Sequence, residues 1–165
     1  MNFKNLITGF ICLIFLNCCT GFKPIYKSNL KQIYRLKDFA IVTDQATVSK
    51  KIKKELITLL PKKRNTLYIL KIEGTTQSLG IVSDSNRRIA RYKVETIAKI
   101  KIYHRKKNVD KLIYSFNDKK IAPYNLISNN IRSTLAGRKK AENITIQLIS
   151  ASIYKRILIF VTKGK

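Results

Sequence analysis

Residues 90–102 read ARYKVETIAKIKI, and this stretch decides the fold. Its even-numbered positions hold Ala, Tyr, Val, Thr and Ile, whereas its odd-numbered positions hold all of its charged residues. Because successive side chains of a strand point to opposite faces, this alternation predicts a β-strand with one face in the core and one basic face. We place the strand at 88–104.

Two neighbouring segments, 67–77 and 109–121, also have the composition of strands. The polar connections around 83–86 and 105–108 are short, which suits antiparallel neighbours. We expect the following residues of these two segments to share the core face: Tyr68, Leu70, Ile72, Leu112, Tyr114 and Phe116.

A short strand and a helix precede this sheet. Residues 39–42 are apolar enough for a strand, and either Thr43 or Asp44 can cap the helix that follows. That helix has its apolar residues at helical spacing over 48–60 and stops before Pro61.

A longer helical pattern runs over 126–151, and Gly137 weakens its middle by about 1 kcal/mol relative to alanine. The tail at 157–161 fits either a helix end or an extended segment. The element order is therefore β-α-β-β-β-α. This order predicts an α+β two-layer sandwich, with two helices packed on one face of a four-stranded, mostly antiparallel sheet.

The composition favours one domain and argues against most enzymes. The chain has 165 residues, of which 45% are hydrophobic, enough for a packed core. Its 3 Cys all lie in the first 19 residues and it has 1 His, which excludes a zinc finger, a disulfide framework and a Cys–His nucleophile pair. No phosphate-binding loop or nucleophile elbow occurs, and His104 has no evident acidic or serine partner. We expect a protein that is not an enzyme and that binds no metal or dissociable cofactor.

The charge is one-sided, with 34 Lys and Arg against 9 Asp and Glu, a net charge of +25. Such a field concentrates anions near the surface, so nucleic acid, anionic lipid and acidic saccharide are candidate partners. Lys, Ile and Asn are also abundant throughout, as an AT-rich coding bias would produce. Part of the positive charge therefore needs no function.

The first residues have the pattern of an export signal. Lys4 precedes an apolar run at 6–16, which is shorter than the about 20 residues of a membrane-spanning helix. Cleavage between Cys18 and Cys19 fits a bacterial lipoprotein signal, because Leu16 lies three positions before Cys19. Acyl chains on Cys19 would hold the chain on a membrane without spanning it. The alternative is a plain secretory signal, or an uncleaved anchor, with incidental cysteines.

Several short motifs then follow in a defined order. The cysteine pair is followed by GFKPIY at 21–26, the approach to the third strand reads SDSNRRIARY at 83–92, and the last helix contains RKKAEN at 138–143. With these motifs, the element order and the long final helix, the chain resembles the LptE family of lipopolysaccharide (LPS) assembly lipoproteins, in particular its alphaproteobacterial branch. The resemblance covers essentially the whole domain, 19–165, that follows the signal peptide, 1–18.

The resemblance implies an outer-membrane lipoprotein that is lipid-anchored on the periplasmic face. Members of this family sit as a plug inside a large β-barrel partner, LptD, assist the assembly of that barrel, and contact LPS on its way to the cell surface. The implied partners of this chain are an LptD-type barrel, LPS and, through the covalent lipid at Cys19, the membrane.

The outward face of the sheet is the candidate contact with a barrel. There isoleucines lie among lysines, which gives a mixed apolar and basic surface for a polar, partly acidic lumen. The candidate residues are Ile69, Ile97, Lys99 and Ile113. The alternative is an ordinary solvated face with scattered isoleucines.

Two basic turns are the candidate contacts with LPS. Guanidinium groups match phosphates and carboxylates best, because they form paired, charge-assisted hydrogen bonds. The first turn supplies Arg87, Arg88 and Arg91, and the second, at the opposite end of the strand, supplies Lys106 and Lys107. Either turn is alternatively a soluble connection.

The competing interpretation is a small basic α+β domain that binds nucleic acid. Tyr68, Tyr92 and Tyr103 would then supply stacking surfaces, and the lysines would neutralise phosphates. The export signal opposes this interpretation, and two of the three tyrosines are predicted to face the core. We therefore expect no nucleic-acid partner.

Overall fold

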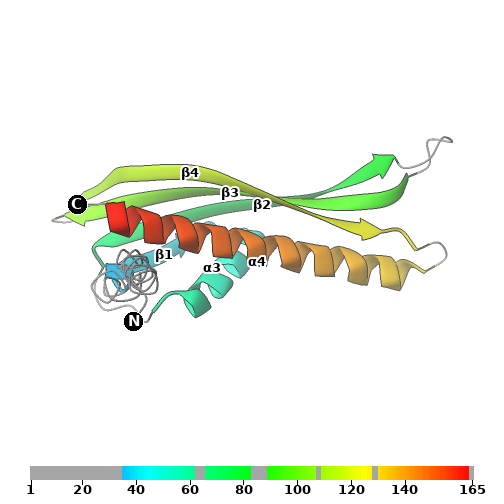
Figure 1. Ribbon diagram of the computed structural model, residues 1–165, viewed down its shortest axis with the longest axis horizontal. Helices are drawn as coiled ribbons and strands as arrows, with labels where there is room; N and C mark the ends of the chain where they lie inside the picture. Colours follow the sequence, from blue (N-terminus) through cyan, green and yellow to red (C-terminus); the bar gives the residue numbers. More distant parts are fainter. Residues whose placement is uncertain (1–34, 62–65, 83–88, 107–108, 128–129, 164–165) are drawn as a thin grey trace, which may run out of the picture. The chain divides into compact units, whose positions relative to one another are not determined.

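The computed structural model describes residues 35–61, 66–82, 89–106, 109–127 and 130–163. All of them belong to one compact unit, Gln32–Lys165. In chain order the elements shown in Figure 1 are β1 (Phe39–Thr43), α3 (Thr47–Leu59), β2 (Tyr68–Val82), β3 (Ile89–Lys106), β4 (Val109–Asn125) and α4 (Ile131–Lys163).

The four strands form one sheet in the order β1-β2-β3-β4. β1 runs parallel to β2, whereas the other two neighbouring pairs are antiparallel. α3 connects the two parallel strands, and α3 and α4 both pack on the same face of the sheet (Figure 1). The expected two-layer α+β sandwich with a mostly antiparallel sheet is confirmed.

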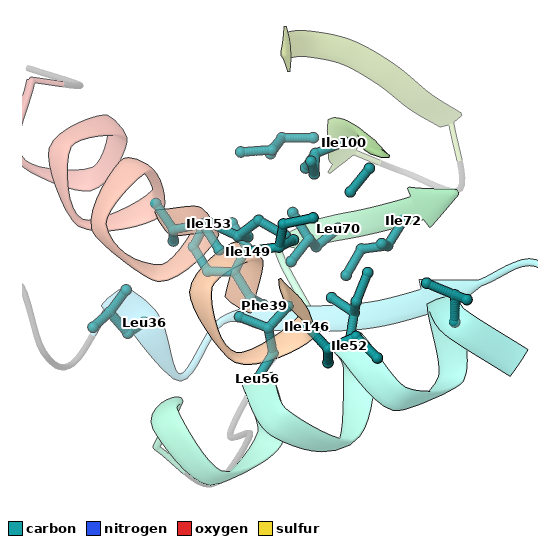
Figure 2. Packing of buried hydrophobic residues seen from close by; sticks show 14 of the residues in the cluster. Leu36, Phe39, Ile52, Leu56, Leu70, Ile72, Ile100, Ile146, Ile149 and Ile153 are labelled. Atoms are coloured by element: carbon teal, nitrogen blue, oxygen red, sulfur yellow. The ribbon is translucent and has the colours of Figure 1, made fainter. Parts of the chain in front are cut away.

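The core lies between the helices and the inner face of the sheet (Figure 2). Leu70 and Ile72 of β2, and Ile100 and Ile102 of β3, are at most 1% exposed, which confirms the core positions expected from the alternation. The helices cover them with residues that are each 0% exposed: Ile52, Leu56, Ile149, Ile153 and Ile157.

Six buried residues of α4 recur every four positions, at 141, 145, 149, 153, 157 and 161, and Ile146 and Ser150 are buried beside this stripe. An α-helix repeats every 3.6 residues, so this stripe drifts around the helix as α4 follows the twisted sheet. Apolar residues consequently occur on all sides of α4. By length and composition α4 is also able to cross a membrane, a test that the core helix of a soluble protein passes as well.

Several boundaries differ from those expected. β2 and β4 extend past the predicted ends at 77 and 121. α4 begins at Ile131 rather than at 126, because β4 and its connection occupy the preceding residues, and it includes the tail at 157–161.

The start of α3 also differs from the prediction. Ala46 occupies the cap position, so neither Thr43 nor Asp44 is the N-cap. Thr43 is the last residue of β1, and Asp44 Oδ1 accepts a hydrogen bond from the Ala46 N–H over 3.2 Å. Asp44 therefore stabilises the turn that leads into the helix.

Leu112 does not lie on the core face, contrary to the prediction. Tyr114 pairs with Ile102 and Leu112 pairs with Tyr103, so Ile113 is an extra residue in β4. Such a β-bulge shifts the in-and-out alternation of every residue beyond it. Leu112 consequently shares the outward face with Tyr103 and is 48% exposed, whereas Tyr114 keeps the expected face.

Candidate interaction surfaces

The face of the sheet opposite the helices is called here the outer sheet face. The strand pairing places alternate residues of β2, β3 and β4 on it, in register across the three strands. It is defined by Ile69, Lys71, Glu73, Gln77, Leu79, Arg91, Lys93, Glu95, Ile97, Lys99, Lys101, Tyr103, Lys119 and Ile121.

Acidic side chains neutralise part of the charge on this face. Glu73 Oε1 lies 3.2 Å from the ammonium of Lys71 and 3.8 Å from that of Lys101. Glu95 Oε2 lies 2.8 Å from the ammonium of Lys119. The outer sheet face is therefore less basic than its lysines alone indicate.

Glu95 is the most enclosed carboxylate of the outer sheet face, only 5% exposed. Lys119 binds one of its oxygens, and Gln77 Nε2 donates a hydrogen bond to the other over 3.1 Å. The hydrogen bond from Lys119 lowers the pKa of Glu95 below its ordinary value, and it outweighs burial, which acts in the opposite direction. Glu95 is consequently charged at neutral pH.

The four residues expected to contact a barrel do not form one cluster. Ile97 and Lys99 both point outward near the middle of β3, the first half-buried and the second exposed. Ile69 also points outward, opposite Tyr103, but it is only 8% exposed. Ile113 is the bulge residue near the same end of the sheet and is 39% exposed. Ile69 therefore offers little contact area compared with the other three.

The two basic turns expected to contact LPS lie at opposite ends of β3. Arg91 is exposed near the start of the strand and Lys106 is exposed at its end. Their separation along an extended chain is about 50 Å, too far for both to bind one phosphate group. The remaining predicted residues lie outside the described residues: Arg87, Arg88, Lys107 and the lipidation site Cys19.

The tyrosines considered for nucleic-acid binding do not share a surface. Tyr68 stacks on Phe39 with ring centroids 5.0 Å apart, and Tyr92 stacks on Tyr124 at 5.4 Å, all on the helix side of the sheet. Tyr103 lies on the outer sheet face. Base stacking along a strand of nucleic acid needs rings on one exposed surface, and these three tyrosines do not supply it.

Acidic and histidine side chains are scattered over the described strands and helices. No three His, Cys, Asp or Glu residues of this part of the chain lie close enough together to hold a metal ion. His104 lies at the end of β3, with its ring 5.4 Å from the ring of Tyr68.

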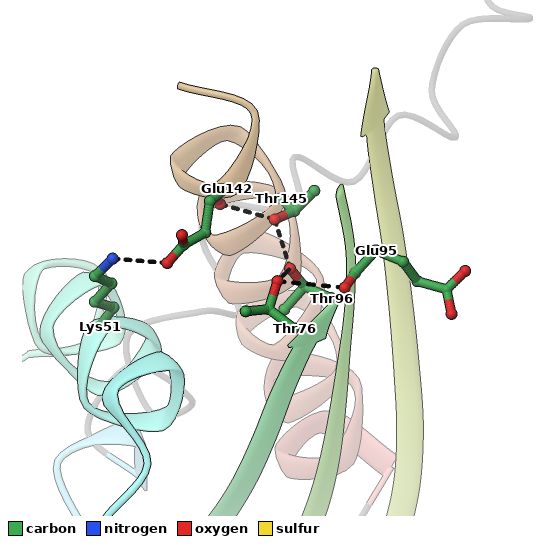
Figure 3. A network of polar contacts seen from close by, with 6 residues as sticks. All are labelled: Lys51, Thr76, Glu95, Thr96, Glu142 and Thr145. Atoms are coloured by element: carbon green, nitrogen blue, oxygen red, sulfur yellow. Dashed lines mark hydrogen bonds and ion pairs between the residues drawn. The ribbon is translucent and has the colours of Figure 1, made fainter. Parts of the chain in front are cut away.

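A second basic surface, which was not predicted from the sequence, lies on the outward side of the two helices. We call it the helix layer surface and define it by exposed residues: Lys50, Lys54, Ile57, Arg132, Lys139, Lys140, Ile144, Leu148, Lys155 and Ile159. α3 and α4 are joined by an ion pair between Lys51 and Glu142 over 2.7 Å (Figure 3). The basic segments at 50–54 and 138–140 are the signal of this surface in the sequence, but whether they form one surface depends on how the helices pack.

No protein-family model matches the chain, and no curated protein matches it. Solved structures share its fold. A protein from Caulobacter crescentus CB15 assigned as a lipoprotein superimposes with a TM-score of 0.64 at 8% identity, covering 81% of this chain and 97% of the other.

Two further structures give similar values. A minor lipoprotein from Acinetobacter baumannii has a TM-score of 0.58 at 12% identity and covers 75% of this chain and 92% of its own. Lipoprotein B from Nitrosomonas europaea has a TM-score of 0.57 at 10% identity and covers 76% of this chain and 84% of its own. All three similar proteins are thus described as bacterial lipoproteins, and at these identities the likeness establishes the shared fold.

Proposed function

We propose that the chain is a lipid-anchored outer-membrane lipoprotein of the LptE type, which acts as plug and assembly partner of an LptD-type barrel and contacts LPS. The cysteine motif at the end of the leader and the family resemblance support this proposal. The lipoprotein names of proteins with the same fold support its coarser part, membrane attachment in the bacterial envelope.

The outer sheet face, which neither α3 nor α4 covers in the described part of the chain, is the observation that carries the barrel contact. The helices cover only one face of the sheet, and β2, β3 and β4 are 15, 18 and 17 residues long. The other face combines Ile97 and Ile121 with polar and paired charged side chains. A long, mixed surface of this kind suits contact with a polar protein lumen better than with lipid.

Purification of the tagged chain from membranes tests the barrel contact. A large β-barrel protein should accompany the wild type, and the double variant I97E/K99E should lose it because it places two carboxylates on the outer sheet face. The matched control V109E/K111E changes two exposed residues at the end of the sheet and should retain the barrel. Absence of any barrel with the wild type, or equal loss in both variants, would contradict the proposal.

The anchor is tested by the variant Cys19→Ala. We expect acylated N-terminal peptide in the wild type by mass spectrometry, and a soluble, non-acylated periplasmic product in the variant. An acyl-modified peptide that persists in the variant would refute the assignment of Cys19.

A further inference from the structure

Charge is compensated differently in the two layers of the fold. Each of the four acidic side chains of the strands lies within ion-pair distance of a lysine or arginine: Glu73, Glu95, Asp110 and Asp118. On the helices, the described residues contain one ion pair, Lys51 with Glu142, and this pair lies between α3 and α4. The lysines and arginine of the helix layer surface have no ion-pair partner among the described residues.

Exposed apolar side chains lie among these unpaired cations. Ile57 of α3 is 57% exposed, and on α4 Ile144, Leu148 and Ile159 are 40%, 47% and 51% exposed. These residues are large aliphatic side chains that the core does not use. The three residues of α4 lie along a helix of 33 residues, about 50 Å long.

We propose that the helix layer surface docks on an anionic phospholipid bilayer, in the chain that has not yet joined a barrel partner. Cations attract the anionic headgroups, while the aliphatic side chains enter the boundary between headgroups and acyl chains. α4 lies along the membrane, because its opposite side is packed on the sheet. This contact goes beyond the proposed function, since it uses the opposite layer and needs neither a barrel nor LPS.

A hollow between the helices fits a phosphate headgroup. It has a volume of about 230 Å³ and is lined by Lys51, Lys54, Asn143 and Gln147, together with Glu55 and Ile146. The ammonium of Lys54 and the side-chain amides of Asn143 and Gln147 are donors that match phosphate oxygens, whereas the ammonium of Lys51 is paired with Glu142. The hollow therefore gives the docking surface a place for a headgroup as well as a flat charged face.

The composition of the helix layer surface favours a bilayer over nucleic acid. The described helices contain two aromatic residues, Tyr154 and Phe160, and both are half-buried against the core. Nucleic-acid bases would therefore find no exposed aromatic ring on the described helices to stack on. Exposed isoleucine and leucine, in contrast, favour a membrane, because moving them from water into the interface lowers the free energy.

Vesicle flotation tests the proposal, with the full chain carrying Cys19→Ala so that no acyl chain contributes. The wild-type surface should bind vesicles of phosphatidylglycerol and phosphatidylethanolamine and dissociate at high salt, because the attraction is electrostatic. Vesicles of phosphatidylcholine alone should bind it at least about tenfold more weakly. Equal binding to both kinds of vesicle would overturn the proposal.

Two pairs of variants locate the surface. K140E/K155E on α4 should weaken binding at least about tenfold, whereas K93E/K111E, with the same change of charge on the strands, should stay within about twofold of the parent. Leu148→Glu should also weaken binding, and Leu79→Glu on the outer sheet face should not. Circular dichroism is the control that each variant is folded.

If K140E/K155E and K93E/K111E lose vesicle binding equally, the net positive charge of the whole chain attracts the vesicles. That result would contradict a specific docking face. Single-stranded polyuridylate serves as the competing ligand. If K140E/K155E weakens RNA binding as strongly as vesicle binding while Leu148→Glu alters neither, the surface binds nucleic acid and the proposal fails. Because the assay contains no barrel and no LPS, its outcome is independent of the proposed function.

Discussion

The backbone N–H of Gly74 donates a hydrogen bond to Ser49 Oγ over 2.7 Å, and this bond ties the middle of β2 to the first turns of α3. β1 ends at Thr43, which pairs with Ile72, so Gly74 lies just beyond the end of its neighbouring strand. The serine hydroxyl therefore accepts the hydrogen bond of a backbone N–H that β1 is too short to reach. Both residues are buried, so the sheet and α3 are held together at a point that water does not reach.

Gly74→Ala should destabilise the fold. The new methyl group would lie 3.2 Å from Ile52 Cδ1 and from Ser49 Oγ, and 3.3 Å from Val48 Cγ1, so the close contact between strand and helix would have to open. We expect a loss of about 1–3 kcal/mol in the free energy of unfolding, measured by urea denaturation.

Gly137→Ala is the matched control for this substitution. Its methyl group would meet only Tyr124, at 3.8 Å or more, and alanine favours a helix over glycine. This variant should therefore be stabilised by up to about 1 kcal/mol. A Gly74→Ala protein as stable as the wild type would show that β2 and α3 separate easily.

The fold was predictable because its strongest signals are local. The alternation over 90–102 and the spacing over 48–60 depend only on near neighbours in the sequence. They predicted the two layers and the core positions of β3 and α3 correctly, except for Leu59, which is 43% exposed. The position of Leu112 was predicted wrongly because a β-bulge depends on how β3 and β4 pair across the sheet. The alternation within 109–121 contains no sign of the extra residue.

The distribution of charge over the two layers was not predictable for a related reason. Glu73 and Glu95 find their lysines across neighbouring strands, and the register of the sheet decides which residues meet. The basic residues at 50–54 and at 138–140 come from helices far apart in the sequence. Whether they form one surface depends on the contact between α3 and α4, which Lys51 and Glu142 mark.

The buried threonines between β3 and α4 should be energetically coupled (Figure 3). Thr145 Oγ1 donates to the carbonyl oxygen of Glu142 over 2.7 Å, so Thr96 Oγ1 donates to Thr145 Oγ1, also over 2.7 Å. Thr96→Val should cost about 1 kcal/mol in the free energy of unfolding, and T96V/T145V less than the sum of the two single variants. A double-mutant cycle with urea denaturation measures the coupling, and strictly additive losses would contradict it.

Stability should fall in acid partly because of Glu95. The pKa of this carboxyl group in the folded chain is lowered from its ordinary value of 4.5, so in that range the unfolded chain binds more protons. The contribution of Glu95 is therefore present above pH 4.5 and is lost as the pH falls from there through the lowered pKa. Urea midpoints measured against pH should fall less steeply for Glu95→Gln and for Lys119→Met than for the wild type. Identical pH profiles in all three proteins would show that the pair with Lys119 does not stabilise the fold.

Arg91→Glu should weaken LPS binding without unfolding the domain. Arg91 is exposed on the outer sheet face near the start of β3, and exposed charges contribute at most about 1 kcal/mol to stability. Reversing its charge replaces a fork of donors for phosphate with a repelling carboxylate. Lys111→Glu, an exposed lysine near the opposite end of the sheet, is the matched control and should bind LPS as the wild type does. Binding is measured by titration with LPS and folding by circular dichroism. If the two variants bind equally well, Arg91 is not part of the site, and the charge that attracts LPS lies elsewhere on the chain.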